Sequence, residues 1–283
     1  MIYSYLDSRL GNLMFEIAAG ASLAKCVGTP FKAVADNKWG TLDYIKPFRK
    51  TIFRKVDFQE NFPENVETYS QPTFTYSPLP LQNNLILNGG FQSEKYFDRD
   101  LARSLFEIDE ETEAYIKNKY SSILFRKPVG IHVRRGDYLF YEHKHPVYRM
   151  SYFNKAISRF APGTSFLVIG DDIGWCKKHF KGEQFSFSEN ESPLVDLYLL
   201  TMCSHNIISN STFAWWGAWL NPNPEKKVVY PLPWFGPSFR VSTDDLCPED
   251  WIAISVSEKA TWYYIRYSHV RRAIRKIRRI CGL

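Results

Sequence analysis

Short apolar runs alternate along the chain with longer segments whose apolar residues recur at helical spacing. The apolar runs are continuous rather than alternating, as expected of strands that are covered on both faces. They predict strands at residues 2–5, 85–87, 129–133, 166–169, 206–209 and 228–230. The intervening segments predict helices at residues 13–27, 98–119, 151–160, 173–180, 194–204 and 213–220. This alternation favours an α/β fold with a mostly parallel sheet.

The chain is expected to divide at residues 120–128, which follow the long predicted helix and precede the strongest predicted strand. We therefore expect an N-terminal domain of residues 1–125 and a C-terminal domain of residues 126–258, followed by a separate tail at 259–283. A stretch rich in proline and aromatic residues, 62–84, is expected to be irregular.

Composition and charge change this picture only at the tail. Hydrophobic residues make up 45% of the chain and charged residues 23%, which is typical of a globular protein and excludes a disordered or collagen-like one. The net charge is +6, but residues 259–283 hold eight Lys and Arg and no Asp or Glu. Without them the 36 basic residues fall to 28 against 30 acidic ones, so the body is close to neutral.

Cysteine usage and the absence of membrane patterns suggest a cellular compartment. The five cysteines are odd in number and widely spaced, with no Cys-x-x-Cys pair, so we expect neither a disulfide framework nor a zinc site. Free cysteines fit a reducing compartment. The sequence shows no secretory signal pattern and no apolar run of about 18 residues. We therefore expect a cytoplasmic protein.

The strongest chemical signal lies where the predicted strand 129–133 ends. The residues that carry it are His132, Arg134, Arg135, Gly136 and Asp137. Open α/β sheets bind ligands at the carboxyl ends of their strands. Paired Arg side chains match phosphate oxygens, and the glycine allows close approach. The pattern indicates an anion site, with a plain ion pair between Arg135 and Asp137 as the alternative.

A second signal follows the predicted strand 206–209, where Ser209, Asn210, Ser211 and Thr212 lead into a tryptophan-rich helix. Asn, Ser and Thr are good helix caps. The free N–H groups and positive dipole end of a helix also bind anions. The pattern indicates either simple capping or phosphate binding. The helix tryptophans, Trp215, Trp216 and Trp219, are expected to pack in the core rather than to stack on sugars.

Two weaker signals follow two other predicted strands. After 2–5 come Arg9, Gly11 and Asn12, in which the glycine permits a tight turn and the asparagine can cap a helix or reach a ligand. After 166–169, Asp171 and Asp172 place two carboxylates at a strand end. Metal binding is the less favoured interpretation, because no His or third acid is nearby. Hydrogen bonding to a base or ribose, or helix capping, is favoured instead.

Taken in order, these pieces resemble the α-1,2-fucosyltransferases of glycosyltransferase family 11, from about residue 6 to Trp234 and Phe235. The blocks that carry the resemblance are Arg-Leu-Gly-Asn-Leu-Met-Phe (9–15), Gly-Gly-Phe-Gln-Ser-Glu-Lys-Tyr-Phe (89–97), His-Val-Arg-Arg-Gly-Asp-Tyr (132–138), Gly-Asp-Asp-Ile-Gly-Trp-Cys (170–176) and Cys-Ser-His-Asn-Ile-Ile-Ser-Asn-Ser-Thr-Phe-Ala-Trp-Trp (203–216). Leu13 stands where the family usually has Gln, and Gly90 where an aromatic residue is common. These departures would affect acceptor contacts more than donor chemistry.

The resemblance implies an α/β, GT-B-like fold in which two Rossmann-like domains face a central cleft. The N-terminal domain would shape the acceptor side and the C-terminal domain would bind GDP. The implied reaction is the inverting transfer of L-fucose from GDP-β-L-fucose to the 2-hydroxyl of a terminal β-galactoside in a surface glycan. It forms an α-1,2 linkage and requires no divalent metal and no cofactor other than the donor substrate.

In this reaction the protein itself must neutralise the charge that develops on the GDP diphosphate. The expected diphosphate contacts are Arg135, helped by Arg134, and the N–H groups of Ser211 and Thr212, next to Asn210. Arg9 and Asn12, with Gly11 in their turn, would close on the diphosphate or fucose from the other domain.

Further roles follow for the remaining residues. Asp171 or Asp172 would read the guanosine, and His132 would support Arg135 or touch the nucleotide. The base that takes the acceptor proton is left open between Asp137 and Glu142, with His143 and His145 as rivals.

The tail forms a separate prediction. In residues 262–283 the apolar side chains fall at helical spacing among Arg and Lys, which is typical of an interfacial amphipathic helix. We expect peripheral docking on the anionic cytoplasmic face of the inner membrane, close to lipid-linked acceptors. A helix packed on the body, or a disordered end, is the alternative.

Two rival functions remain. The first is a fucosyltransferase of other regiochemistry, forming an α-1,6 or peptide O-linked product. The second is a nucleic-acid-binding protein that acts through the basic tail. We favour the enzyme, with no nucleic-acid partner, because the charge of the tail explains neither the Arg-Arg block nor the Ser-Asn-Ser-Thr block.

Overall fold

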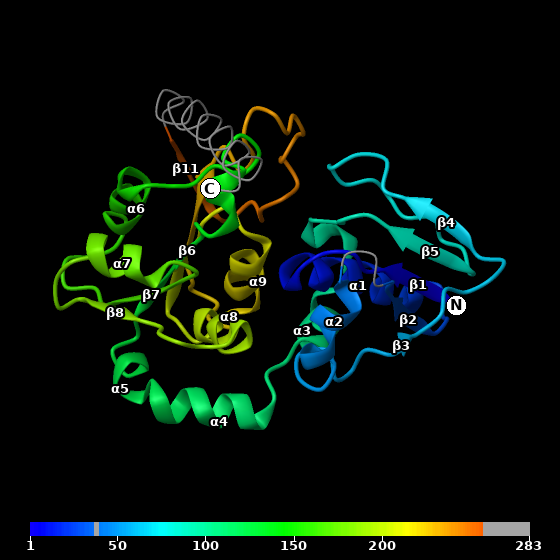
Figure 1. Cartoon of the computed structure of the whole chain (residues 1–283), viewed down its shortest axis with the longest axis horizontal. Coiled ribbons are helices and arrows are strands. Elements are labelled where there is room, and N and C mark those ends of the chain that lie inside the picture. The colour runs from blue at the N-terminus through cyan, green and yellow to red at the C-terminus, as the bar shows by residue number, and fades with distance from the viewer. Residues whose placement is uncertain (37–39, 257–283) are drawn as a thin grey trace, which may run out of the picture. The chain divides into compact units, whose positions relative to one another are not determined.

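The computed structural model describes residues 1–36 and 40–256, which form parts of two compact units (Figure 1). Unit 1 comprises residues 1–118 and 242–249. Unit 2 comprises residues 119–241 and continues from residue 250. Relative to the expected domains 1–125 and 126–258, the division falls somewhat earlier, and residues 242–249 return to unit 1.

Unit 2 is built on six parallel strands in the order β11-β10-β9-β6-β7-β8. They are β6 (Val129–Val133), β7 (Phe166–Gly170), β8 (Phe185–Phe187), β9 (His205–Ile207), β10 (Val228–Leu232) and β11 (Ile252–Ser255). Read along the chain, this is the strand order of the Rossmann fold. Because the order reverses between β6 and β9, the carboxyl ends of these two strands form the switch point of unit 2, the place where open α/β sheets bind ligands.

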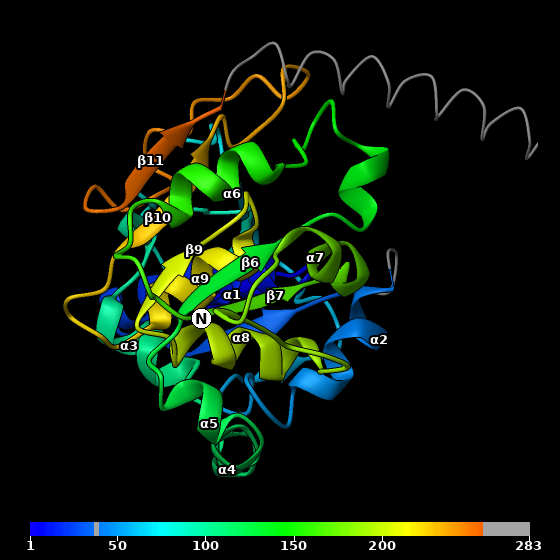
Figure 2. The same ribbon diagram turned by 90° about the vertical axis from the view of Figure 1, so that its left-hand side faces the viewer.

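Helices cover both faces of this sheet. The helices of unit 2 are α5 (Ser121–Leu124), α6 (Met150–Ile157), α7 (Ile173–His179), α8 (Pro193–Thr201) and α9 (Thr212–Leu220), with the 3-10 turn η3 (Asp137–Phe140). Figure 2 shows α6 on one side of the sheet and α8 on the other. Helices α8 and α9 approach so closely that a Cβ on Gly217 would lie 2.7 Å from the Leu200 side chain.

The three tryptophans of α9 belong to this core. Trp215 and Trp216 are fully buried and Trp219 is 1% exposed. Trp215 and Trp219 stack with 6.0 Å between ring centroids. The expectation that these rings pack in the core rather than on sugars is confirmed.

Unit 1 holds five parallel strands in the order β3-β2-β1-β5-β4. They are β1 (Ile2–Tyr5), β2 (Phe31–Val34), β3 (Phe58–Gln59), β4 (Glu67–Ser70) and β5 (Leu85–Asn88). The accompanying helices are α1 (Leu10–Cys26), α2 (Thr41–Ile45), α3 (Arg99–Leu105) and α4 (Glu110–Lys119), with the 3-10 turns η1 (Lys46–Phe48) and η2 (Glu94–Tyr96). Here the order reverses between β1 and β5, so the loops after these strands flank the switch point of unit 1.

One helix prediction is wrong in a way that the structure explains. The segment 98–119 was expected as a single helix, but it divides into α3 and α4. Asp109 accepts hydrogen bonds from both the N–H and the hydroxyl of Thr112, at 2.9 and 2.8 Å. A side chain that binds the N–H three residues ahead caps a new helix, so the chain starts α4 there.

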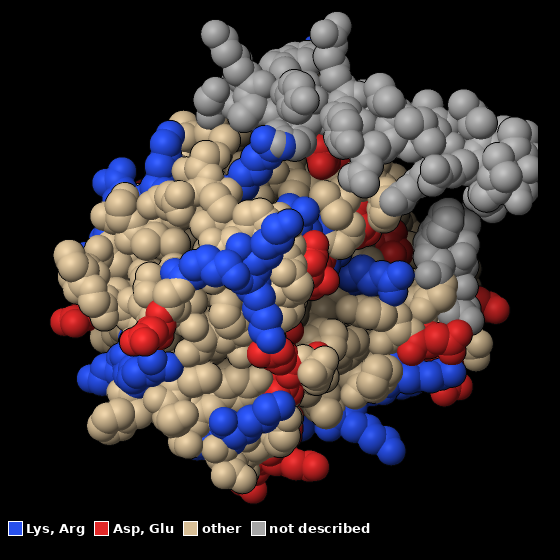
Figure 3. All heavy atoms as spheres, turned by 60° about the vertical axis from the view of Figure 1, so that its left-hand side comes forward, with Lys and Arg blue, Asp and Glu red and all other residues tan. Residues whose placement is uncertain are grey.

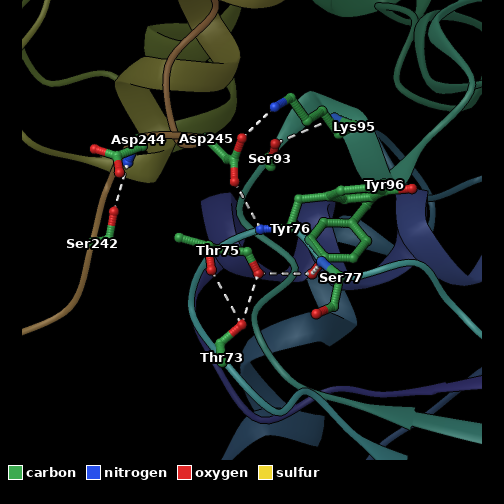
Figure 4. Close-up of polar contacts among 10 residues, drawn as sticks. All are labelled: Thr73, Thr75, Tyr76, Ser77, Ser93, Lys95, Tyr96, Ser242, Asp244 and Asp245. Carbon is green, nitrogen blue, oxygen red and sulfur yellow. Dashed lines mark hydrogen bonds and ion pairs between the residues drawn. The ribbon is translucent and has the colours of Figure 1, made fainter.

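Residues 242–249 are fixed to unit 1 by a small polar network (Figure 4). Asp245 forms an ion pair with Lys95 of η2 and accepts a hydrogen bond from the N–H of Tyr76 at 3.0 Å. These contacts hold the pKa of Asp245 below its ordinary value. Leu246, next along the segment, is 2% exposed. This short segment thus secures the loop around Tyr76, which lies in the stretch expected to be irregular.

Other features of the described residues bear on the sequence expectations. No helix within 1–36 and 40–256 has the length and apolar character needed to cross a membrane. Cys26, Cys176, Cys203 and Cys247 are free thiols. Basic and acidic side chains lie side by side on the face drawn in Figure 3, in keeping with a nearly neutral body. The predicted tail helix at 262–283 lies outside the described residues.

Candidate functional site

The two strongest sequence motifs meet at the switch point of unit 2. Strand β6 pairs with β9, with Ile131 opposite Ile207. One step beyond, His132 Nδ1 lies 2.8 Å from Ser209 Oγ. The hydroxyl of Tyr138 donates to the carbonyl oxygen of Asn210 at 3.3 Å. The loop after β6 and the loop after β9 are therefore in direct contact.

Arg135 is fixed from three sides. Its Nε donates to Asp172 Oδ2 at 3.1 Å, and its backbone N–H donates to Asp171 Oδ1 at 2.8 Å. Its guanidinium carbon lies 4.2 Å from the ring centroid of Trp175, a cation–π contact. Within the described part of the chain, neither terminal nitrogen has a hydrogen-bond partner. These nitrogens form a rigidly aimed fork that matches phosphate oxygens.

Arg134 is engaged differently. Its Nη1 binds Asp171 Oδ2 at 2.9 Å and its Nη2 binds Asp137 Oδ1 at 2.6 Å. The expected alternative of an ion pair between Arg135 and Asp137 is therefore wrong, because Asp137 pairs with Arg134. With both terminal nitrogens bound to carboxylates, Arg134 fixes the shape of the loop and is less available to an anion than Arg135.

The two aspartates after β7 hold the arginines in place. Besides binding Arg135, Asp172 accepts the N–H of Trp175 at 3.0 Å and so caps α7. The capping alternative therefore holds for Asp172. A Cβ on Gly136 would lie 2.5 Å from Asp171 Oδ2, so the glycine permits the close approach of this carboxylate. Asp171 or Asp172 was expected to bind the guanosine. Both carboxylates are already bound to arginine in this structure.

The start of α9 offers backbone donors. Ser211 is the N-cap residue, but its side chain makes no capping hydrogen bond. Its N–H donates to the carbonyl of Ser209 at 2.8 Å, so the expected donor at Ser211 is already in use. Among the described residues, the N–H groups of Thr212 and Phe213 meet no protein acceptor, as is normal in a first helical turn. The available donors thus begin one residue later than expected.

Asn210 is buried beside this helix start. It is 1% exposed, and its Nδ2 donates to the carbonyl of Trp234 at 2.9 Å. Its Oδ1 is buried and meets no hydrogen-bond partner within residues 1–36 and 40–256. Asn210 therefore ties the loop after β9 to the loop after β10 and keeps one acceptor oxygen unused.

His132 lies beneath the arginine loop. It is 5% exposed, and burial, assisted by the charge of Arg134, lowers its pKa to about 3. The ring is therefore neutral at physiological pH. Its contacts with Ser209 and with the Phe213 ring, 5.5 Å away between centroids, link β6 to the start of α9.

This buried imidazole predicts a loss of stability in acid. The unfolded chain takes up a proton near pH 6.5, whereas folded His132 does not until about pH 3, so stability falls as pH drops through 6.5. When the pH is lowered from 7.5 to 5.5, this group is expected to reduce the free energy of unfolding by about 1.4 kcal/mol. Urea titrations of wild type and His132→Asn measure it. An equal pH dependence in both proteins would contradict the assignment.

The loop with the base candidates is fastened to the loop after β10. The N–H of Gly236 donates to the carbonyl of Lys144 at 2.8 Å, and Ser238 Oγ donates to that of His143 at 2.6 Å. Glu142, in this loop, is 7% exposed. The loop is therefore ordered, with a buried carboxyl group among its residues.

The other base candidates are close by. The His145 ring stacks on Tyr138 with 4.6 Å between centroids, and burial lowers its pKa. The Asp137 side chain is 58% exposed and bound to Arg134.

In unit 1, the motif of Arg9, Gly11 and Asn12 follows β1, as the sequence predicted. Arg9 precedes α1 and its guanidinium carbon lies 4.6 Å from the ring centroid of Tyr44. Gly11 lies inside α1 with no positive φ, so the tight turn expected there is wrong. Asn12 Oδ1 accepts a hydrogen bond from Gln92 Nε2 at 3.2 Å.

Sequence reasoning missed Trp175, Tyr138, Tyr44 and Gln92. Trp175, Tyr138 and Gln92 lay in blocks that had been singled out, whereas Tyr44 did not, and no local signal pointed to the contacts that these side chains make. Within the described residues, no group of three His, Cys, Asp or Glu side chains is arranged to hold a metal ion.

Comparison with known proteins places this geometry in context. The family model described as glycosyl transferase family 11 matches residues 4–255. The chain is 34% identical over 181 residues to an α-1,2-colitosyltransferase of Escherichia coli, covering 59% of this chain and 61% of the relative. It is 34% identical over 249 residues to galactoside α-(1,2)-fucosyltransferase 1 of Plecturocebus brunneus, covering 76% and 64%. The chain thus spans about three fifths of the length of these relatives.

A solved structure supports the architecture. The NodZ α-1,6-fucosyltransferase soaked with GDP-fucose superposes with a TM-score of 0.50 at 16% identity, covering 78% of this chain and 92% of that one. With the two parallel sheets, this likeness confirms the expected α/β, GT-B-like fold of two Rossmann-like domains.

Proposed function

Because the chain belongs to glycosyl transferase family 11, a family of glycosyltransferase enzymes, we propose that it transfers L-fucose from GDP-β-L-fucose to the 2-hydroxyl of a terminal β-galactoside. The bond between fucose C1 and the phosphate oxygen breaks, and its electron pair stays on GDP. The galactose oxygen bonds to C1 from the opposite face and its proton leaves. The β-linked donor thus gives an α-1,2-linked product, which we assign to a surface glycan.

The names of the relatives support this linkage. Both curated relatives described above carry α-1,2 transfer in their names, and one names a galactoside acceptor. The α-1,6 enzyme shares the fold at only 16% identity, so it carries no argument on regiochemistry. We therefore place α-1,2 transfer ahead of the α-1,6 and peptide O-linked alternatives.

The observation that carries the proposal is the unused guanidinium fork of Arg135 at the switch point where α9 begins. The departing GDP gains negative charge, and preorganised donors aimed at such charge accelerate a reaction. Arg135 and the first N–H groups of α9 supply donors from two neighbouring strand ends. In this scheme Asp172 and Trp175 position Arg135, and Arg134 positions the loop. No divalent metal takes part.

The acceptor proton needs a base, and we retain Asp137 and Glu142 for this role. Asp137 is joined to the arginine cluster by its ion pair with Arg134. Glu142 is buried in the fastened loop. In unit 1, we assign Arg9 and Asn12 to the fucose and diphosphate.

The proposed function is tested by incubating the full chain with GDP-fucose, a chelator and a panel of β-galactosides and β-N-acetylglucosaminides. We expect release of GDP and a product whose NMR spectrum shows fucose α-linked to galactose O2. A second donor that lacks the fucose 3-hydroxyl, as in colitose, tests the sugar preference. Fucose on a primary hydroxyl, or a reaction abolished by the chelator, would contradict the proposal.

We also propose that the protein works in the cytoplasm and that its basic tail docks on anionic membrane near lipid-linked acceptors. Eight basic residues without an acid should each add about 1 kcal/mol near an anionic leaflet. Deleting residues 259–283 is expected to abolish co-sedimentation with phosphatidylserine vesicles and to leave turnover on a soluble galactoside unchanged. Equal sedimentation of both proteins would remove the membrane role.

A further inference from the structure

A half-buried glutamine at the switch point of unit 1 is not used by the reaction described so far. Gln92 follows β5, and its Nε2 donates to Asn12 Oδ1 in the first turn of α1. Its Oε1 is buried and has no hydrogen-bond partner among the residues that the structure describes. The contact with Asn12 fixes which end of the amide is offered, so the unused group is a hydrogen-bond acceptor.

The turn that presents Gln92 is strained. Phe91 has a φ of +44°, which a residue with a large side chain rarely adopts. Such strain persists only where the surroundings enforce it, and it concentrates at ligand sites. Here the N–H of Phe91 donates to Gln71 Oε1 at 2.8 Å, and its buried ring meets Tyr96 edge-on with 5.2 Å between centroids.

The enforcing contacts continue outward through the network of Figure 4. The Tyr96 hydroxyl accepts the N–H of Ser77 at 2.9 Å. Asp245 then holds the neighbouring Tyr76 and Lys95. The backbone before Gln92 is therefore fixed by contacts from outside the turn, and the amide is presented by a rigid element.

We propose that Gln92 determines acceptor specificity by accepting a hydrogen bond from a ring hydroxyl of the galactoside, other than the one that reacts. This inference rests on the proposed function. The unused oxygen suits a sugar hydroxyl rather than the diphosphate, because phosphate oxygens are themselves acceptors and offer it no hydrogen. A carbonyl oxygen seeks a hydroxyl donor, which a sugar supplies. The residue as a whole is partly exposed, so its amide lies close to the surface of unit 1.

Gly90 supports this role. A Cβ at that position would lie 3.3 Å from Gln92 Nε2, tighter than most contacts of a real Cβ. A larger residue at this position would press on the amide.

The test pairs enzyme variants with deoxygalactosides. Wild type, Gln92→Met and Gln92→Glu are compared on β-galactosides that lack the 3-, 4- or 6-hydroxyl. For one of these acceptors, wild type should lose about tenfold in kcat/KM, as expected for one hydrogen bond. On the intact acceptor, kcat/KM of Gln92→Met should be about tenfold below that of wild type. When the same variant is given the deoxy acceptor instead, its kcat/KM should fall by less than a further twofold. Gln92→Glu keeps an acceptor oxygen and should retain the discrimination.

The controls separate this inference from the proposed function. Gln82→Met changes an exposed glutamine of unit 1 and should behave as wild type. The KM for GDP-fucose is measured for each variant, and a rise in this KM that exceeds the loss on the intact galactoside would assign Gln92 to the donor sugar and overturn its role at the acceptor. Should wild type fail to fucosylate any galactoside, the proposed function itself fails. Should wild type act while Gln92→Met discriminates among the deoxy acceptors as wild type does, only the role of Gln92 is overturned.

Discussion

Replacing Arg135 with alanine is expected to lower fucosyl transfer by about 10²–10³-fold without unfolding the protein. The side chain is 14% exposed and is the arginine of its loop whose terminal nitrogens remain available, so its loss removes the donor fork from the departing diphosphate. The neighbouring Asp172 retains the cap of α7, and the local structure should persist. Turnover with saturating GDP-fucose measures the effect, and circular dichroism checks the fold.

Two companion variants sharpen this result. Arg135→Lys keeps the charge but loses the planar fork, so its turnover should fall between wild type and alanine. Arg159→Ala removes an exposed arginine near the end of α6 and should leave turnover unchanged. Near-normal transfer by a folded Arg135→Ala protein would remove this residue from the diphosphate site.

Replacing Thr212 with proline is the second change with a large expected effect. Proline deletes one backbone N–H at the first position of α9, where helices tolerate it. The preceding residue, Ser211, has a φ of −132° and a ψ of 127°, which suits a residue before proline. We therefore expect normal thermal stability and a loss of turnover of about 10²-fold, because one diphosphate donor is gone.

Thr212→Ala provides the matched control, because it removes the side chain but keeps the N–H. It should stay within about threefold of wild type in kcat/KM, the lower end of what one hydrogen bond contributes. If proline and alanine reduce turnover equally, the threonine side chain matters and the helix N–H group does not. If neither has an effect, the Thr212 N–H does not bind the diphosphate.

The strand ends that carry the candidate site could be predicted from sequence because buried parallel strands are continuous apolar runs. Val129–Val133 and Phe166–Gly170 lie in the middle of the sheet and have this character. The polar residues after them therefore had to emerge at its carboxyl edge. Edge strands lacked the signal. The strand Glu67–Ser70 is mostly exposed and pairs on one side only, and no apolar run marks it.

The pairing inside the site could not be predicted, because it depends on the path of a loop. Spacing alone offered an ion pair between Arg135 and Asp137, two residues apart, as the alternative to an anion site. The loop instead turns Arg135 towards Trp175 and Asp172 and leaves Asp137 to Arg134. Backbone donors behave likewise, because the Ser211 N–H is taken by Ser209 only in the folded turn.

Contacts between distant segments set a second limit. Asp245 accepts a hydrogen bond from Tyr76, which is far away in the sequence. No local sequence pattern indicates that residues 242–249 belong to unit 1. The Gln92–Asn12 contact likewise joins residues from two strand ends, although both lay in motifs already noted. The motifs located these residues in the sequence, and only the structure shows which of them form hydrogen bonds with one another.

The most direct test of the account is a crystal structure of the full chain with GDP bound. The account predicts the diphosphate within hydrogen-bond distance of the terminal nitrogens of Arg135 and of the N–H groups of Thr212 and Phe213. A nucleotide seated away from the ends of β6 and β9, or a diphosphate held through a metal ion, would contradict it.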